Sequence, residues 1–176
     1  EDRLERDGPF PPREAAELTR QLGWALEHAH AQSLLHRDVK PANVLIDTAG
    51  QPLLTDFGLV KDLDPDVSRL SRSGQFLGTP GYTPPEQARG ALKSIGPHSD
   101  VYSLGATLYT LLTGESPARG ETLLEIYTAT QTVVPTPPST LRPEVDPSLE
   151  AICMRCLEKD PLGRYATARA LAQALE

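Results

Sequence analysis

Two short runs of charged and amide side chains flank a short apolar stretch of the sequence. The first run contains Asp38, Lys40 and Asn43 within residues 36–43, and the second run begins with Asp56. A carboxylate can orient a hydroxyl and accept its proton, carboxylate and amide oxygens bind Mg²⁺, and a lysine stabilises charge on a phosphoryl group. This set of residue types indicates phosphoryl transfer from ATP, provided that the chain brings the two runs together.

The apolar stretch between the two runs predicts a small β-hairpin. Apolar residues 44–46 are followed by turn-forming residues 48–51 and by Leu-Leu-Thr at 53–55. Because a hairpin brings its ends together, we expect Asp38 and Asp56 to lie close to each other on one edge of the fold.

Most of the remaining sequence has helical spacing. An apolar stripe follows Pro12, and a long apolar helix is expected to be capped by Ser99 and to end at Gly114. The stripe after Pro12 belongs to a predicted helix over residues 12–31. Further helices are predicted at about 121–131, 147–158 and 167–175. Residues 59–85 read as a long loop, and the Pro-rich stretch 135–147 joins two helices. The predicted fold is mainly α with a small β-hairpin.

Composition disfavours several classes of function. The 176 residues suffice for one domain, and no stretch approaches the roughly 18 apolar residues of a membrane span. A net charge of −7 disfavours nucleic acid as a partner. Cys153 and Cys156 form a C-x-x-C pair, which can hold a metal or a redox disulfide. They share helical spacing with Leu149, Ile152 and Leu157, so we favour buried, reduced thiols and a cytoplasmic location.

Five motifs follow one another along nearly the whole chain. They are H-R-D-x-x-x-x-N at 36–43, D-F-G at 56–58, G-T-P-G-Y-T-P-P-E at 78–86, D-V-Y-S-L-G at 100–105 and D-P-L-G-R at 160–164. This series resembles the protein kinase family. The runs H-R-D-V-K-P-A-N-V-L-I and P-P-E-Q resemble its bacterial members of the eukaryotic type, while Pro84 stands where the family usually has alanine.

The resemblance implies that residues 1–176 are the C-terminal, large lobe of a protein kinase domain, without the N-terminal lobe. Its catalytic loop is expected at about 36–43 and its activation segment at about 56–86. The implied activity is that of an ATP-dependent protein serine/threonine kinase, because the lysine two residues after Asp38 is typical of Ser/Thr transfer. The implied cofactors are ATP and Mg²⁺, with Mn²⁺ as an alternative ion, and the implied substrates are proteins with Ser or Thr acceptors. A dimer of the parent for autophosphorylation is left open, and no membrane contact is expected from this segment.

The resemblance also implies roles for the residues of the two charged runs. Asp38 is expected to be the catalytic base, and Lys40 to neutralise charge on the γ-phosphate of ATP. Asn43 and Asp56 are expected to bind the metal ion and so to hold the nucleotide. Thr79 is expected to bond near Asp38 and to position the substrate.

Other residues are expected to support the site. Val44, Leu45 and Ile46 are expected to floor the adenine site and to stack on the central helix of the lobe. The residues with an expected structural role are His36, Arg37, Phe57, Glu86, Asp100 and Arg164. Among them, Glu86 is expected to form a buried ion pair with Arg164, and Asp100 to hold the backbone of the turn before Asp38.

Ser71 and Ser73 are expected to be phosphorylation sites in the long loop. Bacterial relatives typically carry their acceptors eight and six residues before the equivalent of Thr79, where these serines stand. A phosphate there matches the guanidinium of Arg37. The alternative is that both serines only keep the loop soluble.

Two features that the family needs are absent from the 176 residues. There is no G-x-G-x-x-G loop and no lysine before Lys40. We therefore expect a fragment of a longer kinase that transfers phosphate poorly by itself, and a membrane anchor in the parent is left open. A pseudokinase-like scaffold and a non-kinase interaction module are the alternatives, although the intact set around Asp38 argues against a scaffold.

Overall fold

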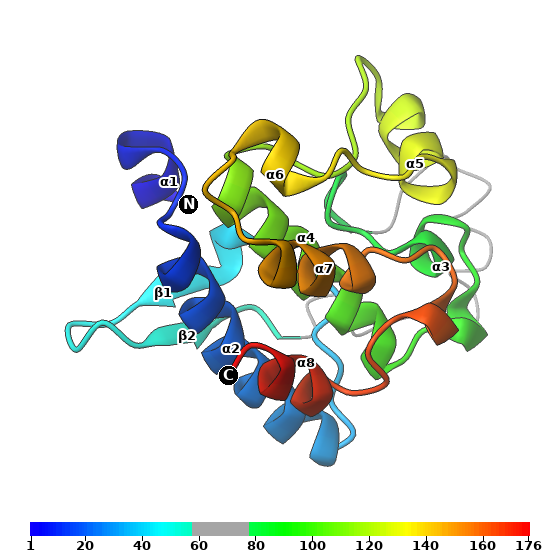
Figure 1. The fold of residues 1–176 in the computed structure, drawn as a ribbon. Helices are drawn as coiled ribbons and strands as arrows, with labels where there is room; N and C mark the ends of the chain where they lie inside the picture. Colours follow the sequence, from blue (N-terminus) through cyan, green and yellow to red (C-terminus); the bar gives the residue numbers. More distant parts are fainter. Residues whose placement is uncertain (58–77) are drawn as a thin grey trace.

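The structure is a computed structural model, and it describes residues 1–57 and 78–176. Helices dominate it and two short strands form an antiparallel hairpin, which confirms the predicted fold class. Figure 1 shows the hairpin projecting from one side of the helical body. The elements are α1 (Asp2–Asp7), α2 (Pro12–Ala31), η1 (Pro41–Asn43), β1 (Val44–Ile46), β2 (Pro52–Leu54), α3 (Pro85–Ala88), η3 (Leu92–Ser94), α4 (Pro97–Thr113), α5 (Leu123–Thr132), α6 (Pro138–Leu141), α7 (Pro147–Cys156), η4 (Pro161–Gly163) and α8 (Ala168–Ala174).

Helix α4 runs through the middle of the helical body, with α2, α7 and α8 packed around it (Figure 1). Residues 99–112 of this helix are all buried. Three of its buried hydroxyls are satisfied locally, since Ser103, Thr107 and Thr110 each donate to the carbonyl four residues earlier. Gly114 ends the helix at a φ of 78°, the left-handed conformation that glycine adopts at low cost.

The start of α4 differs from the prediction that Ser99 caps it. Gly96 is the N-cap residue and Pro97 occupies the first turn, so the helix begins two residues before Ser99. Proline suits this position because the first N–H groups of a helix have no intrahelical partner. Ser99 still serves the helix start, since its hydroxyl accepts a hydrogen bond from the Gly96 N–H at 3.2 Å.

Small residues allow the helices around α4 to approach closely. A Cβ atom at Gly105 would lie 2.2 Å from the Cβ atom of Cys156, and one at Gly23 of α2 would lie 3.1 Å from that of Ala172 in α8. Cys153 and Cys156 are free thiols with no exposed surface, which confirms the prediction of a buried helix face. Burial raises the pKa of the Cys156 thiol to about 12.

The hairpin is a short ladder closed by an aspartate turn. Leu45 lies opposite Leu53, and the carboxylate of Asp47 accepts hydrogen bonds from the N–H groups of residues 49 and 51, both at 2.8 Å. Val44 and Leu54 pack against the cluster formed by α2 and α4, whereas Leu45 and Leu53 are 56% and 51% exposed. The hairpin therefore exposes the apolar pair Leu45 and Leu53, and Ile46 is exposed as well.

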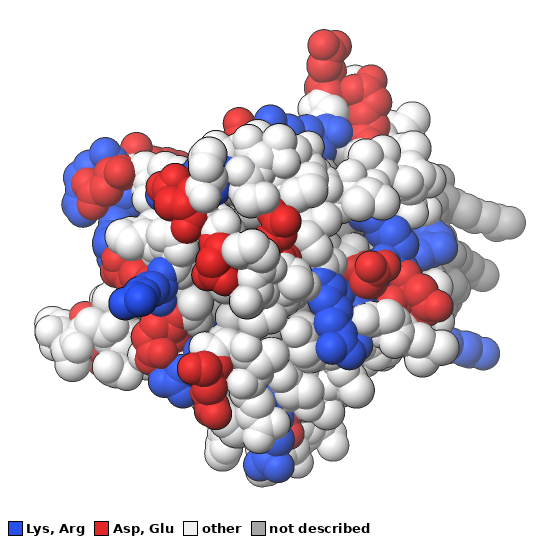
Figure 2. Space-filling view, viewed as in Figure 1, with Lys and Arg blue, Asp and Glu red and all other residues white. Residues whose placement is uncertain are grey.

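Two short α-helices were not predicted from the sequence. They are α3 and α6, of which α6 lies inside the Pro-rich stretch 135–147, whereas the resemblance implied a helix near Glu1, where α1 lies. The predicted loop 59–85 falls mostly outside the described residues, and its last residue already belongs to α3. Within residues 1–57 and 78–176, no helix combines the length and the apolar character that a bilayer crossing requires. On the face shown in Figure 2, acidic and basic side chains are interspersed.

Candidate active site

The charged residues of the catalytic loop converge on one carboxylate. Lys40 Nζ lies 2.8 Å from Asp38 Oδ2, and the Thr79 hydroxyl donates to Asp38 Oδ1 at 2.8 Å. Asn43 Nδ2 donates to the Asp38 carbonyl at 2.8 Å and lies 3.3 Å from its carboxylate. Lys40 also donates to the Thr79 hydroxyl at 2.5 Å. Two segments that are distant in sequence thus meet at a carboxylate whose side chain remains 25% exposed.

The surroundings of Asp38 favour its ionised form. Partial burial opposes ionisation, but the hydrogen bonds from Lys40 and Thr79 and the charge of Lys40 outweigh it, so the pKa of Asp38 is below its ordinary value. Asp38 is therefore a carboxylate at neutral pH, with lone pairs that a substrate hydroxyl can reach from the exposed side.

The backbone in front of Asp38 is held by a buried aspartate from α4. Asp100 accepts hydrogen bonds from the N–H of His36 at 2.9 Å and from the N–H of Arg37 at 2.7 Å. Arg37 has a φ of 69°, which a side-chain-bearing residue rarely adopts. His30 of α2 lies 2.7 Å from Asp100 and adds a third contact. The sequence pointed to Asp100 but not to His30, because nothing in the spacing of the histidines marks this pairing.

His36 links the catalytic loop to the end of β2. Its Nε2 lies 2.8 Å from the Thr55 carbonyl, and its Nδ1 accepts from the Asp38 N–H at 3.3 Å. These partners assign the proton of a neutral ring to Nε2. The ring centroid lies 4.6 Å from that of Phe57, and the residue is 1% exposed. His36 is thus packed and hydrogen-bonded on both nitrogens, with no position left for a metal ion.

The hairpin brings the two charged runs to the same edge. The Thr55 N–H donates to the Asn43 carbonyl at 3.0 Å, which places Asp56 one residue beyond this bond. Asp56 is exposed and has a φ of 61°, while Asn43 is buried with its amide nitrogen committed to Asp38. Asn43 Oδ1 and the Asp56 carboxylate are the oxygens that remain for a cation. Within the described residues, no group of three His, Cys, Asp or Glu side chains could hold a metal ion by itself.

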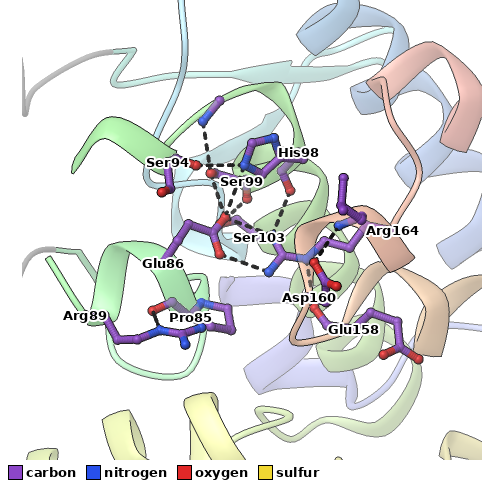
Figure 3. Close-up of polar contacts among 12 residues, drawn as sticks. Pro85, Glu86, Arg89, Ser94, His98, Ser99, Ser103, Glu158, Asp160 and Arg164 are labelled. Atoms are coloured by element: carbon purple, nitrogen blue, oxygen red, sulfur yellow. Dashed lines mark hydrogen bonds and ion pairs between the residues drawn. The ribbon is translucent and has the colours of Figure 1, made fainter. Parts of the chain in front are cut away.

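Glu86 and Arg164 form a buried, two-point ion pair (Figure 3). The two nitrogen–oxygen distances are 2.8 and 2.9 Å, and the residues are 3% and 2% exposed. Ser99 donates to Glu86 at 2.7 Å, while Arg164 also donates to the carbonyls of Glu158 at 2.8 Å and His98 at 3.1 Å. Burial opposes ionisation of Glu86, but Arg164 and Ser99 outweigh it and lower the pKa of the carboxyl. The pair is closed to solvent and can only be structural.

Gln87 connects α3 to the catalytic loop, a contact that the sequence did not reveal. It is 1% exposed, and its Nε2 donates to the Arg37 carbonyl at 3.1 Å. Its neighbour in α3 is Glu86, so the ion pair and this contact share one turn of helix. Gln87 belongs to the P-P-E-Q run, but that run does not indicate a contact with Arg37, because a glutamine has many surface uses.

Some predicted residues cannot be placed. Gly58, Ser71 and Ser73 lie outside the described residues, so the expected phosphorylation sites stay predictions. Leu45 is on the exposed face of the hairpin, where its role toward adenine stays a prediction as well.

Comparison with known proteins gives one family. Residues 1–175 match the protein kinase domain. A probable serine/threonine-protein kinase of Corynebacterium efficiens is 36% identical over 179 residues, which cover 99% of this chain and 27% of that protein. Serine/threonine-protein kinase PknB of Mycolicibacterium smegmatis is 38% identical over 167 residues, covering 95% of this chain and 26% of PknB. Serine/threonine-protein kinase PrkC of Bacillus subtilis is 40% identical over 164 residues, covering 92% of this chain and 24% of PrkC.

The chain thus spans about a quarter of the length of the curated relatives that it matches. The family match covers the catalytic loop, the hairpin and every helix of the described residues. With this match and the convergence of its charged side chains on Asp38, the chain belongs to the protein kinase family.

Proposed function

We propose that the protein containing this chain is a serine/threonine kinase that transfers the γ-phosphate of ATP to Ser or Thr hydroxyls of protein substrates. The observation that carries the proposal is the Asp38 carboxylate, held between Lys40 and Thr79 and open to solvent on one side. Such a carboxylate is placed to orient an acceptor hydroxyl and to receive its proton. The serine/threonine names of the relatives support the class of acceptor.

Lys40 and Thr79 contact each other and both contact the Asp38 carboxylate. The Lys40 ammonium contacts both Asp38 and the Thr79 hydroxyl, so it brings positive charge to the place where a phosphoryl group would accept the attacking oxygen. The Thr79 hydroxyl donates to Asp38 Oδ1, while Lys40 and Asn43 approach Oδ2, so both oxygens are oriented. Each carboxylate oxygen has two lone pairs, and a remaining lone pair can accept the substrate proton.

Asn43 and Asp56 fit a hard cation, which we propose to be Mg²⁺, with Mn²⁺ as an alternative. Both offer oxygens at the same edge of the hairpin, and phosphate oxygens and water would complete the coordination. When bound, the ion neutralises charge on the phosphates. We also propose that Leu45 contacts the adenine ring, since its side chain is 56% exposed on the apolar face of the hairpin.

The proposed regulation and location follow from other parts of the chain. We propose that Ser71 and Ser73 are phosphorylated, with Arg37 as a ligand of the phosphate, and that two copies of the parent meet for this reaction. Two buried, free cysteines are in keeping with a reducing, cytoplasmic setting for this domain. Replacing both serines with alanine is expected to lower activity, and full activity of that variant would contradict this regulation.

The test of the function is phosphate transfer by the full-length protein with Mg²⁺-ATP and a generic protein acceptor. Asp38→Asn is expected to lower the transfer rate by about 10²–10⁴, the usual contribution of a general base. Asp47→Asn is the matched control, because it makes the same change in the exposed hairpin turn, where asparagine is also suited. Equal rates in both variants would contradict the assignment of Asp38. Binding of ATP without any transfer by the unsubstituted protein would favour a pseudokinase-like scaffold.

A further inference from the structure

Helix α5 is anchored to the rest of the molecule through Tyr127. This residue and Thr130 are the buried members of the helix, and Tyr127 is 2% exposed. Figure 1 shows α5 beside α3, next to the segment that leads into α3. The Tyr127 hydroxyl donates to the Gly78 carbonyl at 3.1 Å. Tyr127 therefore connects α5 to the backbone immediately before Thr79.

The segment that Tyr127 contacts is tightly folded. The Thr79 carbonyl accepts hydrogen bonds from the N–H of Tyr82 at 3.1 Å, from the N–H of Thr83 at 3.2 Å and from the Thr83 hydroxyl at 2.8 Å. A Cβ atom at Gly78 would lie 2.7 Å from that hydroxyl, and the φ of Gly78 is 95°. Any side chain at Gly78 would push Thr83 away, so this backbone has one narrow arrangement.

Thr79 joins this segment to the catalytic carboxylate. Its backbone is held by Thr83, and its hydroxyl donates to Asp38 at 2.8 Å. Tyr127 therefore reaches Asp38 through Gly78 and Thr79. Tyr127 and Asp38 also interact electrostatically. Burial raises the pKa of Tyr127, the hydrogen bond with Thr83 lowers it, and the charge of the Asp38 carboxylate raises it. The net effect is a raised pKa of Tyr127. Tyr127 thus remains a protonated donor throughout the neutral range.

We propose that Tyr127 is a positioning residue for phosphoryl transfer, which holds the Gly78–Thr79 backbone so that the Thr79 hydroxyl stays on Asp38. The inference rests on the proposed function and extends it from the catalytic loop to α5. In this role Tyr127 acts through the geometry of Thr79, because its hydroxyl holds the Gly78 carbonyl and the Thr79 hydroxyl donates to Asp38.

The test compares Tyr127→Phe with Tyr109→Phe in the full-length protein. Tyr109 of α4 is a matched control, because it is 1% exposed and its hydroxyl donates to the Thr136 carbonyl at 2.9 Å. Each variant loses a buried phenol–carbonyl hydrogen bond and a second side-chain contact of the phenol, with Thr83 for Tyr127 and with Arg119 for Tyr109, so both should lose similar stability. A displaced catalytic contact costs up to about 10²-fold in rate, and we expect kcat for a protein acceptor to fall about tenfold in Tyr127→Phe alone, with KM for ATP unchanged.

Two further readouts separate positioning from a general loss of stability. In a Thr79→Ala background, Tyr127→Phe should lower kcat no further, because the hydroxyl that it positions is already gone. Amide exchange of residues 78–83 should be faster in Tyr127→Phe than in Tyr109→Phe. Equal kcat values in the two variants, or additive effects with Thr79→Ala, would overturn the inference while leaving the kinase activity intact. No transfer by the unsubstituted protein would instead overturn the proposed function and, with it, this role.

Discussion

Replacing Glu86 with alanine should destabilise the protein far more than an ordinary surface change. The substitution leaves the Arg164 guanidinium, which is 2% exposed, without its only carboxylate among the described residues. Removing one partner of a buried pair costs about 3–5 kcal/mol. Arg164 keeps three backbone acceptors, the carbonyls of Glu158 at 2.8 Å, His98 at 3.1 Å and Lys159 at 3.2 Å, so we expect the lower end of that range.

Thermal unfolding measures this loss directly. For a chain of this size, about 1 kcal/mol lowers Tm by about 2–4 °C, so Glu86→Ala should melt about 6–12 °C below the unsubstituted protein. Glu17→Ala is the control: its carboxylate pairs with Arg20 at 2.7 Å, but its side chain is 48% exposed. Such a surface pair contributes at most about 1 kcal/mol. If Glu86→Ala melts no lower than Glu17→Ala, the buried pair does not exist in solution.

The same pair predicts a dependence on pH. Because the pKa of Glu86 is lowered in the folded protein, its ionised form adds stability that is fully present above its ordinary pKa of 4.5. That stability is lost as pH falls through the lower, folded pKa. In urea unfolding, the difference between the unsubstituted protein and Glu86→Gln should be constant from pH ~7 to ~5 and shrink below ~4.5. A difference that stays constant down to the lowest accessible pH would contradict an ionised Glu86.

Three further predictions concern packing, thiols and the cation. Gly105→Val should lower stability by about 1–3 kcal/mol in thermal melts, because even its Cβ atom would lie 2.2 Å from that of Cys156, and an unchanged Tm would contradict the close approach of α4 and α7. Cys153 and Cys156 should not react with a thiol reagent before the protein unfolds, since both are fully buried and burial raises both pKa values; rapid labelling of the native protein would refute this. Asp56→Asn should raise the Mg²⁺ concentration needed for half-maximal transfer at least about tenfold without a change in Tm, and an unaltered Mg²⁺ dependence would remove Asp56 from the cation site.

The long, regular elements could be predicted from the sequence because their signals are local. The helix expected at residues 12–31 has those bounds in the structure, since Pro12 opens it and an apolar stripe runs along it. The end of α4 was predicted at Gly114, whose φ of 78° lies in the left-handed region that favours glycine. The hairpin was also predicted, because the turn-forming residues 48–51 separate two short apolar runs that pair as strands.

Two short helices and two long-range contacts could not be predicted, for a physical reason. Helices α3 and α6 have four residues each, which is too short for an apolar period to repeat. His30 and Asp100 are 70 residues apart, and Gln87 and Arg37 are 50 residues apart. Such pairs meet only because helices pack around α4, and no local pattern records that packing. The motifs indicated the reacting groups, and the resemblance also indicated Asp100 and Thr79 beside them, but nothing in the sequence indicated the contacts of His30 and Gln87.

Arg37 shows how stability and catalysis are joined in this fold. Its peptide groups are held on both sides, since its N–H donates to Asp100 of α4 and its carbonyl accepts from Gln87 of α3. Its left-handed φ costs about 1–2 kcal/mol, which these two contacts must offset for Asp38 to keep its position. Gln87 is in turn fixed by its neighbour Glu86, whose ion pair ties α3 to Arg164, the residue that follows η4. Weakening that ion pair should therefore lower stability and also loosen the backbone that carries the catalytic carboxylate.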